Sequence, residues 1–381
     1  MAKTIEDVKE RLEAFQGILS FWNKSLREST PNEQVGKAKV VNPLEEVNKL
    51  AKLIKAHSTK TGIAFSSATI GKHCDAGYDC IQKLSESMMF MLQIRFELNP
   101  TEMSQLHYDE VFQLIISLFE ASTSFSTELI KLVDEVEAAK DGGNDNEAAA
   151  GSDKLDNTTE GTIDSGRLVS VGRMWSICDE LVLVVQGGKV AVLSKKLKQS
   201  IALIDDGLEE FAEWTENPDS FDIEDPFGFS DEFDSDEEDD TRVPTHEVNE
   251  SDDEDDKTEL LAFAKVWLQN IKLIKLLLNS LAKSLSSATK GQVIDTIYKT
   301  QLNVVGLIDK LIVDLMMDQV IDDEIEGYGK EIGSNCFKIV KITKDVNKQN
   351  ESKVKWCTAW EAKFTDNNNK NNKNNNNNNN N

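Results

Sequence analysis

The chain has 381 residues, with 42 Lys and Arg against 68 Asp and Glu, and a formal net charge of −26. So negative a chain repels a phosphate backbone, so we do not expect direct nucleic-acid binding. The sequence contains no apolar run near the ~18 residues that a membrane span needs, and its N-terminus lacks the apolar core of a signal peptide. Its five cysteines are scattered, which is typical of reduced thiols in a cytosolic or nuclear protein.

Most of the negative charge is concentrated in one segment. Residues 219–256 contain 19 Asp or Glu and a single basic residue, Arg242. A segment of this composition repels itself and buries little apolar area, so we expect a disordered acidic insert over 219–257. Two interpretations of the insert stay open. It is either a solvated linker or, through Phe227 and Phe229, a peptide that docks on a partner.

Two serines of the insert have the sequence context of phosphorylation sites. Ser235 and Ser251 are each followed by three acidic residues. An acidic residue three places after a serine suits a kinase with a basic substrate cleft, so we expect phosphate at one of these positions. The added charge falls on a segment that is already acidic, and its structural effect should be small.

The N-terminal third has the apolar spacing of amphipathic helices. Residues 4–28 place apolar side chains at alternating steps of three and four, and Thr4 with Asp7 resembles a capping box. A second helix is expected to begin at Pro43, with Asn42 as its cap. Further helices are expected at 74–98 and 104–139, and together these segments predict an N-terminal helical bundle over 1–140.

A flexible linker rich in Gly, Asn, Asp and Ser is expected at 141–165. The next segment, 166–218, is predicted to be a helical hairpin broken at Gly187-Gly188. After the insert, eight apolar residues from Leu260 to Leu285 alternate steps of four and three. The stripe is wider than a coiled-coil seam, so burial in a bundle is favoured over a zipper. Helices at 292–321 and 329–364 complete a C-terminal helical region over 258–364, and the Asn-rich tail 365–381 should be disordered.

The tryptophans divide into two groups. Trp22, Trp175 and Trp267 lie on apolar helix faces, where aromatic side chains are usually buried. Trp356 and Trp360 lie one helical turn apart, close to the tail and surrounded by lysines. They either cap the bundle or present an apolar patch to a partner.

The predicted fold class is all-α, with antiparallel helical bundles and a disordered acidic insert, because the sequence has no segment with the alternation of a strand. The four histidines and five cysteines lack the spacing of a zinc site, and the acidic run lacks the glycine of a calcium loop. We identify no catalytic, metal or cofactor residues, and we do not expect an enzyme.

Two stretches carry a resemblance to a known family. Residues 42–67, NPLEEVNKLAKLIKAHSTKTGIAFSS, and residues 171–181, VGRMWSICDEL, occur in that order. They precede the acidic insert with Phe229-Ser230-Asp231-Glu232 and a helix over Lys265–Leu278. In these features the chain resembles the cyclin-D1-binding protein family, the cyclin-D-interacting, Id-like helical proteins, over about residues 5–345.

The resemblance implies a non-enzymatic regulator that binds a D-type cyclin or a helix-loop-helix factor and restrains cell-cycle progression, in the cytoplasm and nucleus. The sequence agrees with the family in one respect: no Lys/Arg-rich helix precedes an amphipathic one, so a DNA-reading region is missing. From the residues alone, a vinculin-like helical scaffold in the cytoskeleton or in trafficking fits the long helices equally well. The partner and the oligomeric state stay open.

Overall fold

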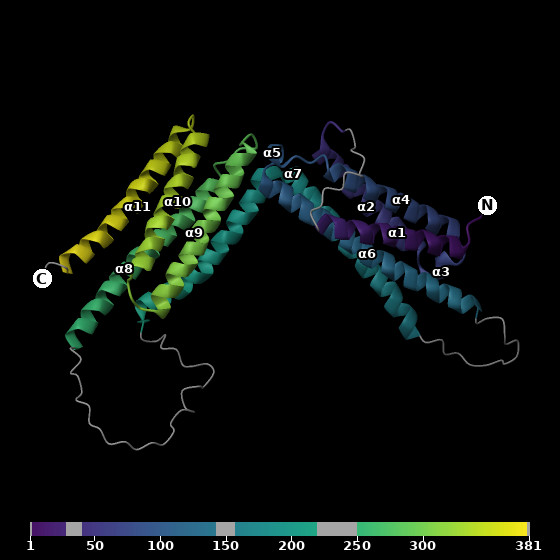
Figure 1. The fold of residues 1–381 in the computed structure, drawn as a ribbon, viewed down its shortest axis with the longest axis horizontal. Helices are drawn as coiled ribbons and strands as arrows, with labels where there is room; N and C mark the ends of the chain where they lie inside the picture. Colours follow the sequence, from purple (N-terminus) through teal and green to yellow (C-terminus); the bar gives the residue numbers. More distant parts are fainter. Residues whose placement is uncertain (1, 28–39, 142–156, 219–249, 379–381) are drawn as a thin grey trace, which may run out of the picture. The chain divides into compact units, whose positions relative to one another are not determined.

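The computed structural model describes residues 2–27, 40–141, 157–218 and 250–378 (Figure 1). All regular secondary structure within these ranges is helical, which confirms the all-α prediction. The chain divides into two compact units, Met1–Val192 and Leu193–Asn381. Within the described ranges, no helix combines the length and apolarity that crossing a membrane requires.

The first two helices of the first unit begin at the caps that the sequence predicts. Thr4 and Asp7 bond reciprocally, with Asp7 N–H donating to Thr4 Oγ1 over 3.1 Å and Thr4 N–H donating to Asp7 Oδ2 over 2.8 Å. Asn42 Oδ1 accepts from the backbone N–H of Glu45 at 3.2 Å. The elements are α1 (Ile5–Arg27), α2 (Pro43–Ala64), α3 (Ser67–Ile70), α4 (Cys74–Arg95), α5 (Pro100–Met103), α6 (Gln105–Asp141) and the first part of α7 (Asn157–Glu216).

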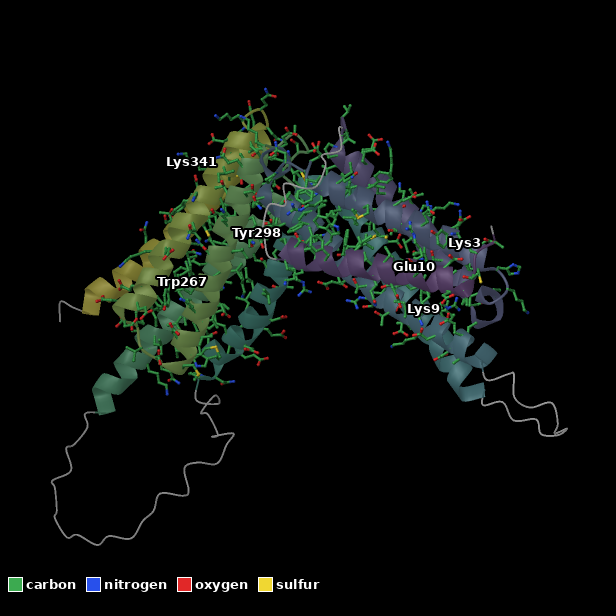
Figure 2. The ribbon with its side chains drawn as sticks, turned by 45° about the vertical axis from the view of Figure 1, so that its right-hand side comes forward. Lys3, Lys9, Glu10, Trp267, Tyr298 and Lys341 are labelled. Carbon is green, nitrogen blue, oxygen red and sulfur yellow. The ribbon has the colours of Figure 1, made fainter. Side chains whose placement is uncertain are left out.

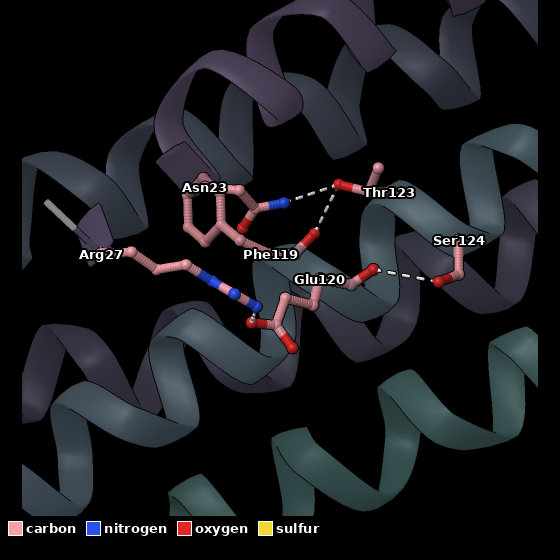
Figure 3. A network of polar contacts seen from close by, with 6 residues as sticks. All are labelled: Asn23, Arg27, Phe119, Glu120, Thr123 and Ser124. Atoms are coloured by element: carbon pink, nitrogen blue, oxygen red, sulfur yellow. Dashed lines mark hydrogen bonds and ion pairs between the residues drawn. The ribbon is translucent and has the colours of Figure 1, made fainter. Parts of the chain in front are cut away.

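A series of polar contacts fixes α1 antiparallel to α6. Lys9 Nζ lies 2.6 Å from Asp134 Oδ1 near one end of the pair. Near the other end, Asn23 Nδ2 donates to Thr123 Oγ1 over 2.8 Å (Figure 3). Because a shift of one residue would break every pair at once, these contacts specify the register of the two helices beyond what apolar packing requires. Between these two contacts, Gln16 bonds to Thr127, and at the end of α1, Arg27 pairs with Glu120.

The five long helices of the first unit form a closed ring. Contacts join each helix to the next, in the order α1, α4, α2, α7, α6 and back to α1. The pairs are Lys3, which lies two residues before α1, with Asp75, then His57 with Ser87, Lys55 with Asp179, His107 with Val184 and Lys9 with Asp134. We expected residues 1–140 to form this bundle alone. The structure adds the first part of α7, because its buried stripe covers apolar faces that the other helices leave open; the stripe includes Val171, Met174, Cys178 and Leu181.

α7 is interrupted at one residue. Gly188 has a φ of 67° and a ψ of −175°, outside the helical region and favourable only for glycine. This confirms the break expected at Gly187-Gly188. The boundary between the units follows, between Val192 and Leu193. It falls inside the segment 166–218 that we predicted as one hairpin, and the two parts of that segment belong to different units.

The second unit is built from the last part of α7 and four more helices: α8 (Glu250–Ala282), α9 (Gly291–Met317), α10 (Asp323–Val346) and α11 (Glu351–Asn378). The heptad stripe of α8 is buried from Leu260 to Leu281, as the pattern predicts. Trp267 is 3% exposed and lies among these helices (Figure 2). A Cβ on Gly329 would come within 2.6 Å of the Trp267 ring, so α10 can approach α8 only with glycine at this position.

Two predicted boundaries in the second unit are wrong. The stretch 329–364 is two helices, because the chain turns at Asn347 and α11 starts with Asn350 Oδ1 accepting from Lys353 N–H at 3.2 Å. α8 begins at Glu250, so residues 250–257 are helical although we assigned them to the disordered insert. Acidic residues in the first turns of a helix interact favourably with its dipole, which our prediction from net charge neglected. The remainder of the insert, 219–249, lies outside the described residues.

The start of the Asn-rich tail is also ordered, against our prediction for 365–381. Asn367 is 7% exposed, and its Nδ2 donates to Asn270 Oδ1 over 3.1 Å. Asn270 is fully buried in α8, and its own Nδ2 donates to Asn368 Oδ1 over 2.7 Å. Composition argues for disorder because asparagine buries no apolar area, but a paired amide can be buried at little cost.

This amide network predicts where the tail becomes dispensable. A chain that ends at Asn369 should keep the free energy of unfolding of the full protein. A chain that ends at Asp366 should lose about 1–3 kcal/mol, because the amide of Asn270 is left buried without a partner. Urea unfolding of both truncated chains beside the full protein measures the difference. Equal stability of all three would contradict the network.

Candidate functional site

The two stretches that carry the family resemblance pack against each other. On one helix, Lys55 Nζ lies 2.7 Å from Asp179 Oδ2 of the other. Two turns away, Gln186 Nε2 donates to Asn48 Oδ1 at 3.5 Å, which is a weak hydrogen bond. Residue numbers rise along α2 as they fall along α7, so the two helices are antiparallel. More than ninety residues of sequence separate the two helices.

The helices approach each other closely at Gly62, near the end of α2. A Cβ at this position would lie 2.9 Å from Val171 Cγ2, so only glycine allows the observed separation. Arg167 is 5% exposed, and its guanidinium donates to the Gly62 carbonyl. This carbonyl belongs to the last turn of α2, where no further helical N–H can reach it. The neighbouring carbonyls of Thr61, Ile63 and Ala64 accept from Phe65 N–H, Ser66 N–H and the Thr69 hydroxyl.

The solvent side of this helix pair is partly apolar. Trp175 is 37% exposed, and its ring centroid lies 5.9 Å from Lys55 Nζ, within the range of a cation–π contact. Leu168 is 58% exposed and lies seven residues earlier, on the same side of α7. Val182 follows seven residues later and is partly exposed. We call these three apolar residues, with Lys55 and Asp179, the α2–α7 outer face.

The ion pair of this face contributes little to stability. Its side chains are 38% and 58% exposed, and a pair so accessible is worth about 0–1 kcal/mol. Its effect is to hold the lysine chain over the indole ring.

Two buried groups lie beneath this face. Burial raises the pKa of the Cys178 thiol to about 12, so the thiol stays protonated and unreactive. Burial also lowers the pKa of His107, whose Nε2 lies 3.2 Å from Val184 O, in keeping with a neutral ring that donates to this carbonyl.

In the part of the chain that the structure describes, no three His, Cys, Asp or Glu side chains are grouped to hold a metal ion. The outer face presents an indole and aliphatic side chains beside a single exposed ion pair. Such a surface suits the docking of an amphipathic helix, which buries its apolar stripe and pairs charges at the rim.

Of the site residues predicted from sequence, four belong to the acidic insert. Phe227, Phe229 and Ser235 lie outside the described residues. Ser251 is the second residue of α8, and its side chain is likewise outside the description. Their roles in partner contact and phosphorylation remain predictions.

The two C-terminal tryptophans occupy different environments. Trp360 is 4% exposed, and its indole N–H donates to Leu273 O over 2.8 Å, so this residue joins α11 to α8 in the core. Trp356 is 37% exposed. Of the two alternatives that we kept open, a structural role therefore fits Trp360, whereas Trp356 retains surface that a partner can contact.

Trp175 is the residue of the outer face that sequence reasoning missed. We expected it in the core with Trp267, but it is one of the exposed aromatic residues. The sequence did carry a signal that Trp175 is exposed, namely its position around the helix relative to the buried stripe. Met174 and Cys178 occupy the buried stripe, and Trp175 is one position off that stripe.

The close approach of α2 and α7 is open to a direct test. Gly62→Ala should lower the free energy of unfolding by about 1–3 kcal/mol, because the added methyl group overlaps Val171. The matched control is Gly172→Ala on α7, where a Cβ meets nothing within 4 Å. It should raise stability by about 0.5–1 kcal/mol through helix propensity. Urea unfolding of both variants measures these changes, and an unchanged stability for Gly62→Ala would rule out the close approach.

Comparison with known proteins places the outer face within a known family domain. Residues 46–217 match the family model described as "Grap2 and cyclin-D-interacting, N-terminal". The matched range contains all five residues of the outer face. The chain is also similar to the uncharacterized protein YLR287C of Saccharomyces cerevisiae, at 26% identity over 340 residues that cover 85% of this chain and 86% of the yeast protein. Residues 46–217 therefore constitute an N-terminal domain of the Grap2 and cyclin-D-interacting family.

Proposed function

We propose that this protein is a non-enzymatic regulator that binds a D-type cyclin or a helix-loop-helix factor and restrains cell-cycle progression. The family domain supports a role in protein interaction. The observation that carries the proposal further is the exposed pair Leu168 and Trp175, which lies on that domain. We also propose that the protein acts in both the cytoplasm and the nucleus.

The chemistry of the outer face suits partners of this kind. Helix-loop-helix factors and cyclins are helical proteins that present amphipathic helices, and such a helix can cover Leu168, Trp175 and Val182 with its own apolar stripe. Trp175 has the properties of an interaction hot spot, because it is large, nearly rigid and held in place by Lys55. Asp179 leaves a carboxylate at the rim that can pair with a basic residue of the partner.

The proposal is tested by co-purification with the tagged full-length protein. We expect it to recover a D-type cyclin or a helix-loop-helix factor, and the double variant Leu168→Ala with Trp175→Ala to reduce recovery about tenfold or more. Loss of one central aromatic anchor typically costs 2 kcal/mol or more of binding free energy, which is roughly this factor.

The control is a pair of exposed leucines elsewhere, Leu203→Ala with Leu302→Ala, which are 64% and 45% exposed. This variant should bind as the unmodified protein does. Recovery of neither partner class would refute the proposed function. If actin-linked or coat proteins were recovered instead, the scaffold alternative would replace it. If both double variants bound normally, the partner would have to dock elsewhere.

A further inference from the structure

Between Lys265 and Lys283, the exposed side of α8 carries lysines and no acidic residue. Six exposed positions follow one another at helical steps of three and four along this side: Lys265, Gln269, Lys272, Leu276, Asn279 and Lys283. In a protein with a net charge of −26, a stripe with three lysines and no carboxylate is unusual. In the middle of the stripe, Leu276 is 57% exposed.

The neighbouring helix α11 extends this stripe. Trp360 donates to Leu273 O, and Lys353 Nζ donates to Lys283 O over 3.3 Å, so α11 is antiparallel to α8. One helical turn from these contacts, Leu276 on α8 and Trp356 on α11 lie at the same level of the pair. The exposed side of α11 adds Lys363 and Lys355, and Lys355 lies 3.6 Å from the exposed carboxylate of Glu351. Asp366 is a second exposed acidic residue, near the end of this side. We call this combined surface the α8–α11 lysine face.

We propose that the α8–α11 lysine face is the docking surface for the acidic segment 219–249 of the same chain. Charge complementarity is the first argument. The segment contains 13 Asp or Glu against one basic residue, Arg242. Opposite it are five lysines around two exposed apolar side chains, Leu276 and Trp356. Phe227 and Phe229 supply the apolar groups that these two can pack against.

The length and attachment of the segment are the second argument. It joins the end of α7 to the start of α8, so both of its ends are fixed to the second unit. Leu276 is 26 residues into α8, about 40 Å from Glu250 at 1.5 Å per residue. The 20 residues between Phe229 and Glu250 span up to roughly 65 Å when extended, which is enough to reach Trp356. Tethering at both ends also raises the effective concentration of the acidic residues at this face.

The consequence is regulatory. The segment competes with any external acidic partner for the lysine face. Phosphate on Ser235 adds up to two negative charges to the segment and strengthens its hold on the lysines.

The test uses zero-length carbodiimide cross-linking of the full-length protein at low salt, with peptide mapping. Amide bonds from acidic residues of 219–249 should form at Lys272, Lys355 and Lys363 about fivefold or more above the exposed control lysines Lys338 and Lys341 of α10. The excess should vanish near 1 M salt, where the screening length falls to about 3 Å. Equal yields at all five lysines at low salt would overturn the proposal.

Two variants make the test independent of cross-linking chemistry. Lys272→Glu with Lys363→Glu should increase cleavage of 219–249 by a glutamate-specific protease several-fold, whereas Lys338→Glu with Lys341→Glu should leave the rate unchanged. All four residues are exposed, so folding should be unaffected, and circular dichroism verifies this. Equal cleavage in both variants would refute docking. Cross-links between isotopically labelled and unlabelled copies would show that a second chain, and not the same one, occupies the face.

Discussion

The approach of α2 to α7 at Gly62 closes the helical ring of the first unit, and much of that unit depends on it. A helix that buries one stripe needs a neighbouring helix on each side of that stripe. For α2, one neighbour is α4 and the other is α7, which follows α2 by more than ninety residues. Glycine lets the backbones meet, and Arg167 caps the end of α2 at the same point. The spacing of Lys55, Trp175 and Asp179 on the solvent side follows from this contact, because they lie one to two turns away along the same pair.

The protein presents two surfaces of different chemistry. The outer face of α2 and α7 is apolar with a balanced ion pair, whereas the exposed side of α8 and α11 is basic with a small apolar centre. Each lies in a different unit. A surface of the first kind gains affinity chiefly from buried area, and one of the second kind responds to salt and phosphate. The same chain can thus bind a partner through one surface, while binding at the other surface depends on ionic strength and on phosphorylation.

Much of the fold could be predicted from the sequence, because the information is local. Apolar spacing placed most helices, Thr4 and Asn42 marked helix starts, and Gly188 marked a break. The errors arose where tertiary contacts outweigh composition. Asn367 is ordered because Asn270, 97 residues earlier, pairs with its amide. The candidate site was predictable only in part: the two stretches stood out by resemblance, but nothing local shows that they touch, and Trp175 was taken for a core residue.

The position of Gly188 has a consequence for dissecting the protein. The family domain ends at residue 217, whereas the first compact unit ends at Val192, inside α7. Between these limits α7 exposes a new apolar stripe as soon as the second unit is removed, from Leu193 and Leu197 to Phe211 and Trp214. A fragment cut at the family boundary would carry this stripe into solvent and tend to self-associate. Cutting a few residues after Gly188 avoids it, so the break in the helix, and not the limit of sequence similarity, defines the portion that can be isolated.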